Sequence, residues 1–188
     1  MKFRLLLPAL LALFCCACVT NIHPDVAGNP PPAEPLSDFQ HYQLMPATIS
    51  AEAAHETEAF AAISTYLEQR AGPMVAVWQN HNQSGRTLKI EPRIEQLKLV
   101  GVGARFWGGN FAGSSAVVMK LKLTDAGTGR VIAEPEFYQR ANAWAGGFSV
   151  GGTDRGMLAR IATVAQEYLQ RNHANAVGGP TGLEESAN

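Results

Sequence analysis

The chain has 188 residues, of which 46% are hydrophobic, and its formal net charge at pH 7 is −1. Removing Lys2 and Arg4 with an N-terminal leader leaves 13 of the 15 basic residues against 16 acidic ones, a net charge of −3. This balance gives no broad basic surface, so nucleic-acid binding is not expected. All three cysteines lie before residue 19, which excludes a disulfide, a thiolate metal site and cysteine catalysis from the remainder.

Residues 1–17 are predicted to form a lipoprotein signal peptide. Lys2 and Arg4 give a short basic start, and an apolar run follows from Leu5 to Phe14. This run matches a signal-peptide core of roughly 7–15 residues, and it is shorter than the about 20 apolar residues that cross a bilayer. The cysteines come directly after the run, where a lipid-modified cysteine would lie.

Cys18 is the predicted lipidation site because the small residue Ala17 precedes it, and Cys16 is the alternative. Val19 follows Cys18. In enteric-type bacteria an aspartate at that position retains lipoproteins at the inner membrane, so Val19 indicates the outer membrane. We therefore expect a palmitate-type anchor in the outer membrane and a domain in the oxidising periplasm, where a body without thiols avoids stray disulfides.

The rest of the chain divides into three parts by composition. Residues 18–38 are rich in proline and are predicted to form an extended tether, which at about 3.1 Å per residue could hold the domain several nanometres from the membrane. Residues 39–173 have a normal length for one domain with one core. Residues 174–188 are small and polar with no apolar period, and they predict a disordered tail.

The first predicted helix begins at Ser50, which is a suitable N-cap residue. Phe60, Ile63 and Leu67 recur at helical spacing after it. Gly72 followed by Pro73 is a stop signal, so the helix is expected to end there. The next five residues, 74–78, are apolar and predict a short buried strand.

Residues 87–100 alternate between apolar and polar side chains and predict a long strand. The alternation changes phase near Gln96, which a β-bulge would explain. Pro92 lacks an N–H donor, so this strand, or that half of it, is expected at a sheet edge.

Residues 115–124 and 130–141 predict a β-hairpin, and a last helix is expected over about 154–172. Glu134 and Glu136 are interpreted as a solvated strand face. The predicted fold class is α+β, with a mixed, mostly antiparallel sheet of about four to five strands and two helices packed on one face.

Two glycine-rich stretches, residues 101–115 and 146–152, are the least regular parts of the predicted domain. Neither has the spacing of a dinucleotide fingerprint or the ending of a P-loop. They are interpreted as strand connectors or, because aromatic residues and arginine are enriched at interface hot spots, as a partner-binding surface; they could equally fold back over the open face of the sheet. The candidate partner-binding residues are Arg105, Phe106, Trp107, Phe111, Trp144 and Phe148.

The segment Gly147 to Gly151 formally matches the nucleophile elbow of serine hydrolases, with Ser149 as the nucleophile. Two residues separate it from the next predicted helix, and only His173 lies downstream as a base. The five histidines show no metal-ligand spacing, and the carboxylates form no convincing acid/base pair. We therefore predict no catalytic residue, no metal site and no cofactor.

Three short motifs lie between residues 99 and 172. A glycine-rich loop ends in Ala-Gly-Ser-Ser-Ala at 112–116, the hairpin carries Asp-Ala-x-Thr-Gly-x-Val-Ile-Ala at 125–133, and the last helix ends in Tyr-Leu at 168–169. Together they resemble a family of uncharacterised proteobacterial lipoproteins that carry a domain of unknown function. The resemblance implies a non-enzymatic periplasmic module and supplies no ligand. The aromatic-rich stretch 105–111 departs from the family pattern.

The leading functional hypothesis is an outer-membrane-anchored periplasmic lipoprotein that acts as a non-enzymatic interaction or accessory module in an envelope assembly. Its expected partners are the membrane, through the lipid, and a protein of the cell envelope. Two alternatives stay open. One is a small serine hydrolase that uses Ser149 with His173, and the other is a binder of a small apolar ligand or lipid between the helices and the sheet.

Overall fold

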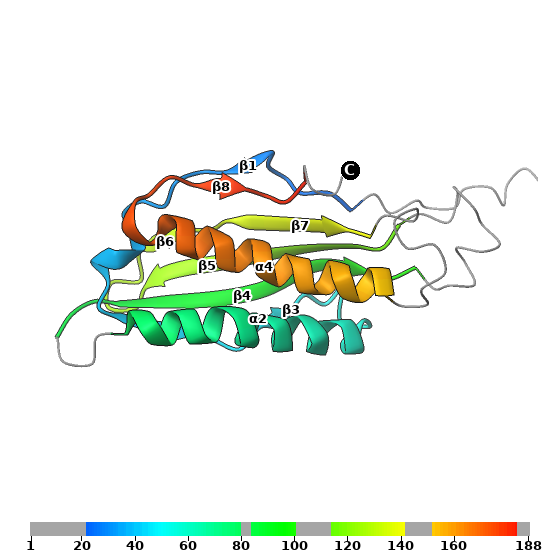
Figure 1. The fold of residues 1–188 in the computed structure, drawn as a ribbon, viewed down its shortest axis with the longest axis horizontal. Coiled ribbons are helices and arrows are strands. Elements are labelled where there is room, and N and C mark those ends of the chain that lie inside the picture. Colours follow the sequence, from blue (N-terminus) through cyan, green and yellow to red (C-terminus); the bar gives the residue numbers. More distant parts are fainter. Residues whose placement is uncertain (1–21, 80–83, 101–113, 142–151, 184–188) are drawn as a thin grey trace, which may run out of the picture.

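The computed structural model describes residues 22–79, 84–100, 114–141 and 152–183. These residues form a sheet with two helices packed against one of its faces, as Figure 1 shows. The elements in chain order are β1 (Gly28–Asn29), η2 (Leu36–Asp38), β2 (His41–Leu44), β3 (Thr48–Ile49), α2 (Thr57–Trp78), β4 (Thr87–Lys98), β5 (Ala116–Asp125), β6 (Val131–Ala133), β7 (Glu136–Arg140), α4 (Gly152–Ala174) and β8 (Gly179–Pro180).

The sheet is built around β4 and β5, which pair antiparallel along almost their whole length. On the far side of β4, β2 and then β3 pair with it in parallel. On the far side of β5, β6 and β7 pair with it antiparallel. The predicted α+β class, with a mixed and mostly antiparallel sheet, is confirmed. Within the described ranges the sheet has six strands rather than four to five, and β1 and β8 form a separate two-stranded sheet.

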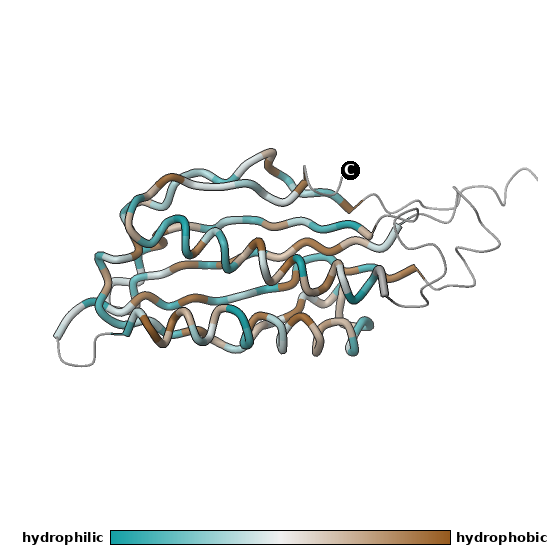
Figure 2. Tube along the Cα trace, in the orientation of Figure 1, coloured by the Kyte–Doolittle hydropathy of each residue, from teal (hydrophilic) through white to brown (hydrophobic). Residues whose placement is uncertain are grey.

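The core lies between the helices and the sheet. Alternate residues of β4 and β5 point toward the helices, and the apolar stripes of the two helices pack against them. Figure 2 shows this alternation of apolar and polar residues along the strands. Fully buried members are Leu88, Ile90, Ile94, Met119, Leu121, Leu123, Phe137, Ile63, Met157 and Ile161.

The phase change near Gln96 is a β-bulge, as expected, because the register between β4 and β5 shifts between Ile94 and Gln96. The bulge keeps Leu97 in the core after the parity of the strand has changed. The expected edge position of β4 is wrong, since β4 has neighbours on both sides. Pro92 is tolerated there because it faces the gap at 45–47 between β2 and β3, where no ladder hydrogen bond is lost.

The first helix differs from its predicted bounds. It begins at Thr57 and continues through Gly72 and Pro73 to Trp78, so the predicted stop and the predicted strand at 74–78 are both wrong. The reason is a buried stripe at four-residue spacing that runs past the proline, so packing against the sheet outweighs the local stop signal. The stripe consists of Ala59, Ile63, Leu67, Ala71 and Val75.

The segments before and after the sheet are part of the fold, which corrects the predicted tether at 18–38 and the predicted tail at 174–188 wherever they are described. β1 pairs with β8, and Leu36 is fully buried in the core. Ala33 N donates to Ile132 O at 2.9 Å, and Tyr138 N donates to Thr181 O at 2.8 Å. These segments cover the outer edges of β6 and β7, whose backbone groups would otherwise be unpaired.

Candidate functional site

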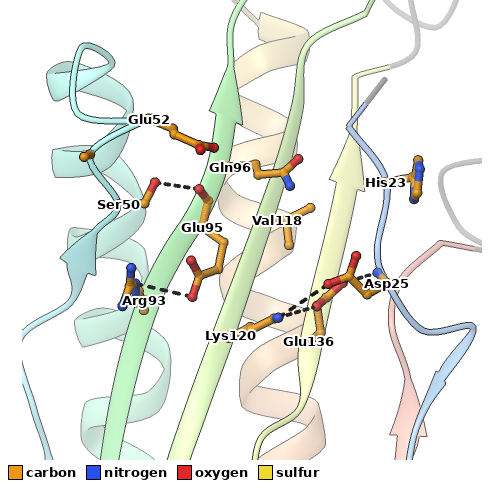
Figure 3. Close-up of a pocket in the computed structure, with 11 residues that line it drawn as sticks. His23, Asp25, Ser50, Glu52, Arg93, Glu95, Gln96, Val118, Lys120 and Glu136 are labelled. Atoms are coloured by element: carbon orange, nitrogen blue, oxygen red, sulfur yellow. Dashed lines mark hydrogen bonds and ion pairs between the residues drawn. The ribbon is translucent and has the colours of Figure 1, made fainter. Parts of the chain in front are cut away.

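The sheet face that the helices leave free carries a hollow of about 390 Å³ (Figure 3). It extends across β4, β5 and β7, between the N-terminal segment on one side and the turn after β3 on the other. Strand alternation places the lining side chains of β4, β5 and β7 on this face, because each is a neighbour of a core residue on the same strand. The polar lining residues that define it are Asp25, Glu52, Arg93, Gln96, Lys120 and Glu136.

Glu136 is the most enclosed charged group of the hollow, with only 4% of its side chain exposed. Its Oε2 lies 3.1 Å from Lys120 Nζ, and its Oε1 accepts a hydrogen bond of 2.5 Å from Asp25 N. Lys120 Nζ also lies 3.6 Å from Asp25 Oδ2. The hydrogen bond to Glu136 raises the pKa of Lys120, so the ammonium group is held in its charged form.

The bulged part of β4 forms the opposite side of the hollow. Ser50 Oγ donates to Glu95 O at 2.6 Å, and Arg93 Nε lies 3.3 Å from Glu95 Oε1. The side-chain amide of Gln96 has no hydrogen bond within the described part of the chain and lines the hollow. Glu52 and Gln96 also line a second, more apolar hollow of about 340 Å³ with Ile22 and Leu97, so the two hollows adjoin.

Arg86 forms a second charged cluster at the start of β4. Its guanidinium donates to Glu34 at 2.7 and 2.9 Å and to Asp125 Oδ2 at 2.8 Å, and it lies over the ring of Phe39 at 4.2 Å. These hydrogen bonds hold the pKa values of Glu34 and Asp125 below their usual range. The cluster fastens the N-terminal segment to the end of β5, which is a structural role.

The C-terminal ends of the two helices meet in an aromatic cluster. The rings of Trp78 and His173 are stacked with centroids 4.1 Å apart, and Tyr42 Oη lies 3.3 Å from His173 Nε2. Burial lowers the pKa of His173, so the imidazole is neutral at pH 7. These contacts hold His173 at the C-terminal end of α4. Gly152 lies at the other end of this helix, which is about 34 Å long. Ser149, the nucleophile of the serine hydrolase hypothesis, lies outside the described residues.

Most of the predicted site residues lie outside the described ranges. They are the lipidation site Cys18 and the partner-binding candidates Arg105, Phe106, Trp107, Phe111, Trp144 and Phe148. The described residues that precede or follow the ranges 101–113 and 142–151 include Val100, Ser115 and Ala141, which lie together, since Ser115 Oγ accepts from Val100 N and Ser115 O accepts from Ala141 N, both at 2.9 Å. Within the described ranges, no group of three or more His, Cys, Asp or Glu residues could bind a metal ion.

The hollow itself was missed by sequence reasoning. Alternation along β5 places Lys120 on the face away from the core, but the interpretation of Glu136 as a solvated residue is wrong. It is buried because Asp25, 111 positions earlier in the chain, covers it. No local pattern signals that contact. The bulge at Gln96 was the one available signal, because bulges redirect side chains and are frequent beside functional sites.

No family model and no curated protein matches the chain. Similar solved structures include the PelC dodecamer from Paraburkholderia phytofirmans, which is 12% identical with a TM-score of 0.40 over 72% of this chain and 91% of that one. A Caulobacter crescentus CB15 protein described as a candidate lipoprotein is 14% identical (TM-score 0.36, 74% and 92% covered). A Xanthomonas campestris protein of the DUF330 family is 13% identical (TM-score 0.39, 88% and 97% covered). Similarity this low carries no argument about function.

Proposed function

We propose that this protein is a lipoprotein anchored through Cys18 in the outer membrane, and that it acts in the periplasm as a non-enzymatic interaction module of an envelope assembly. The leader and its cysteines support the anchor. Neither described helix is long and apolar enough to cross a membrane. The observation that carries the interaction role is the hollow of about 390 Å³ on the helix-free face of the sheet.

The chemistry of the hollow favours binding over catalysis. The carboxylates of Glu136 and Glu95 are paired with Lys120 and Arg93, and the raised pKa of Lys120 makes it a poor general base. By contrast, Gln96 and Glu52 offer a free amide and an exposed carboxylate. Such groups can form hydrogen bonds with a partner without first breaking a bond within the protein.

We include the two glycine-rich stretches in the proposed interaction surface. The nearby described residues Val100, Ser115 and Ala141 lie at the end of the sheet where Leu97 and Lys98 line the second hollow. Aromatic side chains and arginine supply much of the binding energy at protein interfaces. The proposed partner-binding residues there remain Arg105, Phe106, Trp107, Phe111, Trp144 and Phe148.

A binder of an apolar ligand between the helices and the sheet is less well supported. That interface is filled by fully buried side chains such as Met119, Phe137 and Ile161. The hollow of about 390 Å³ lies instead on the opposite face of the sheet. The buried interface therefore serves as the core of the domain.

The test is crosslinking in living cells from a photoreactive amino acid placed at Gln96 or at Trp107. A matched control carries the same amino acid at Val77, which is 83% exposed on α2, on the helix side of the molecule. We expect positions 96 and 107 to capture the same envelope protein, and Val77 not to capture it. Cys18→Ser is expected to reduce the capture because the domain is then no longer held near its partner.

Two results would count against the proposal. Equal capture from Val77 would show that the helix-free face is not the binding surface. A correctly localised protein that captures nothing from position 96 or 107 would contradict the interaction role itself.

A further inference from the structure

Very little chain separates the proposed anchor from the folded domain. Ile22 is 8% exposed and packs with Ala116, Val118 and Tyr138 on the helix-free face of the sheet. Cys18 lies only four residues before Ile22. Because an extended chain spans at most about 3.3–3.6 Å per residue, the lipid-bearing cysteine lies within about 14 Å of Ile22.

The segment after Ile22 is fixed to the sheet by hydrogen bonds, so it does not lengthen the connection between Cys18 and the domain. Asp25 N donates to Glu136 Oε1, and Asn29 makes two hydrogen bonds with the backbone of Glu136. Asn29 Oδ1 accepts from Glu136 N at 2.7 Å, and Asn29 Nδ2 donates to Glu136 O at 2.8 Å. Asn29 is buried, which protects these hydrogen bonds from water. The distance from the anchor to the sheet is therefore set by residues 19–21 alone.

Ile22 lies at one end of the long axis of the sheet. It lines the second hollow together with His55 and Lys98, and Lys98 and Arg140 both pair with Ala116 across the sheet. Figure 1 shows that α2 and α4 also begin at this end. The turn after β5, which contains Ala126, lies at the other end. The ten residues of β5 separate the two ends by about 30 Å at 3.3–3.4 Å per residue.

We propose that this anchor end, defined by Ile22, His55, Lys98 and Arg140, rests on a phospholipid surface, with the long axis of the sheet pointing away from the membrane. The inference depends on the lipidation of Cys18 proposed above. The short connection leaves the anchor end no room to move away, whereas the turn at Ala126 lies tens of ångströms further out. The anchor end then faces the headgroup layer of the bilayer, and a protein partner bound by the glycine-rich stretches at this end would itself lie at the membrane surface.

The orientation can be measured by fluorescence energy transfer to acceptor lipids. The lipidated full-length chain is placed in vesicles of phosphatidylethanolamine and phosphatidylglycerol with acceptors in the headgroup layer. Because no cysteine follows Cys18, single donor labels can be attached through His55→Cys or Ala126→Cys, both at exposed positions. We expect clearly higher transfer from position 55 than from position 126. Equal transfer, or higher transfer from 126, would overturn the proposal.

Two further variants separate this inference from the proposed function. Inserting about 20 Gly/Ser residues between residues 21 and 22 adds roughly 25 Å of flexible reach, and it should abolish the difference between the two labels. A difference that survives the insertion would also overturn the proposal, since the short connection would not be its cause. If the lipidated chain and Cys18→Ser bind vesicles equally poorly, the anchor itself is refuted. Firm binding with equal transfer refutes only the orientation.

Discussion

At the scale of single residues, Gly72 and Gly178 place different demands on the backbone. Gly72 lies inside α2, and a Cβ atom there would meet no atom within 4 Å. Gly178 has a φ of 73°, and a Cβ atom there would collide with the backbone oxygen of Asn29 in the N-terminal segment. The same substitution should therefore have opposite effects at the two positions.

We expect Gly72→Ala to raise the free energy of unfolding by about 0.5–1 kcal/mol, because alanine loses less entropy in a helix. Gly178→Ala should lower it by about 1 kcal/mol or more, because of the left-handed backbone and the collision. Urea unfolding of the two variants measures both changes. A neutral result at Gly178 would show that the C-terminal segment is not docked against Asn29.

His173 should make stability depend on pH in a known direction. Burial lowers its pKa in the fold, so its contribution is complete above the unfolded pKa of about 6.5 and is lost as the pH falls through the lower folded value. Glu34 and Asp125, the acids bound by Arg86, have lowered pKa values, so their contribution to stability is lost only below about pH 4. Urea midpoints between pH 7.5 and 5 should fall more for the natural chain than for His173→Gln. Parallel curves would contradict this role.

At the scale of elements, α2 shows where local sequence signals fail. A Gly-Pro pair normally ends a helix, yet Ala71 and Val75 on either side of it are both buried against the sheet. The proline therefore remains inside α2 at a cost that tertiary packing outweighs. We expect Pro73→Ala to raise the free energy of unfolding by about 1–3 kcal/mol, measured by thermal or urea unfolding. A destabilised variant would show that the proline has a packing role of its own.

The sequence predicts the secondary structure correctly where apolar residues keep a strand or helix period over many positions. The strands at 87–98 and 116–125, the last helix and the bulge near Gln96 all follow from side-chain alternation or helical spacing. The position of β4 inside the sheet could not be predicted, because the gap between β2 and β3 that accommodates Pro92 depends on two separate segments. The hollow likewise depends on contacts between residues far apart in the chain.

At the scale of the whole molecule, the main revision concerns residues 22–38. A proline-rich composition usually indicates an extended linker, but here the prolines lie in a segment that follows the edge of the sheet and ends with Leu36 in the core. Stretches of low apolar content can still be ordered when a sheet edge offers them hydrogen bonds. Composition alone does not reveal such an edge.

Two substitutions in this segment separate a folded edge from a tether. Leu36→Ala should lower the free energy of unfolding by about 2–5 kcal/mol, because Leu36 is fully buried. Val26→Ala, at a position that is 40% exposed, should change it by no more than about 0.5 kcal/mol. Equally small effects at both positions in urea unfolding would restore the tether interpretation.

Amide hydrogen exchange of the full chain tests most directly the claim that the chain from Ile22 onward is a fixed part of the domain. Ala33 N donates to Ile132 O and Asp25 N donates to Glu136 Oε1, so both amides should exchange slowly, together with those of β6 and β7. If residues 22–38 exchange as fast as an unstructured peptide while β4 and β5 stay protected, the segment is a tether. That result would contradict both the claim that residues 22–38 are a fixed edge of the domain and the proposal that the anchor end lies on the membrane.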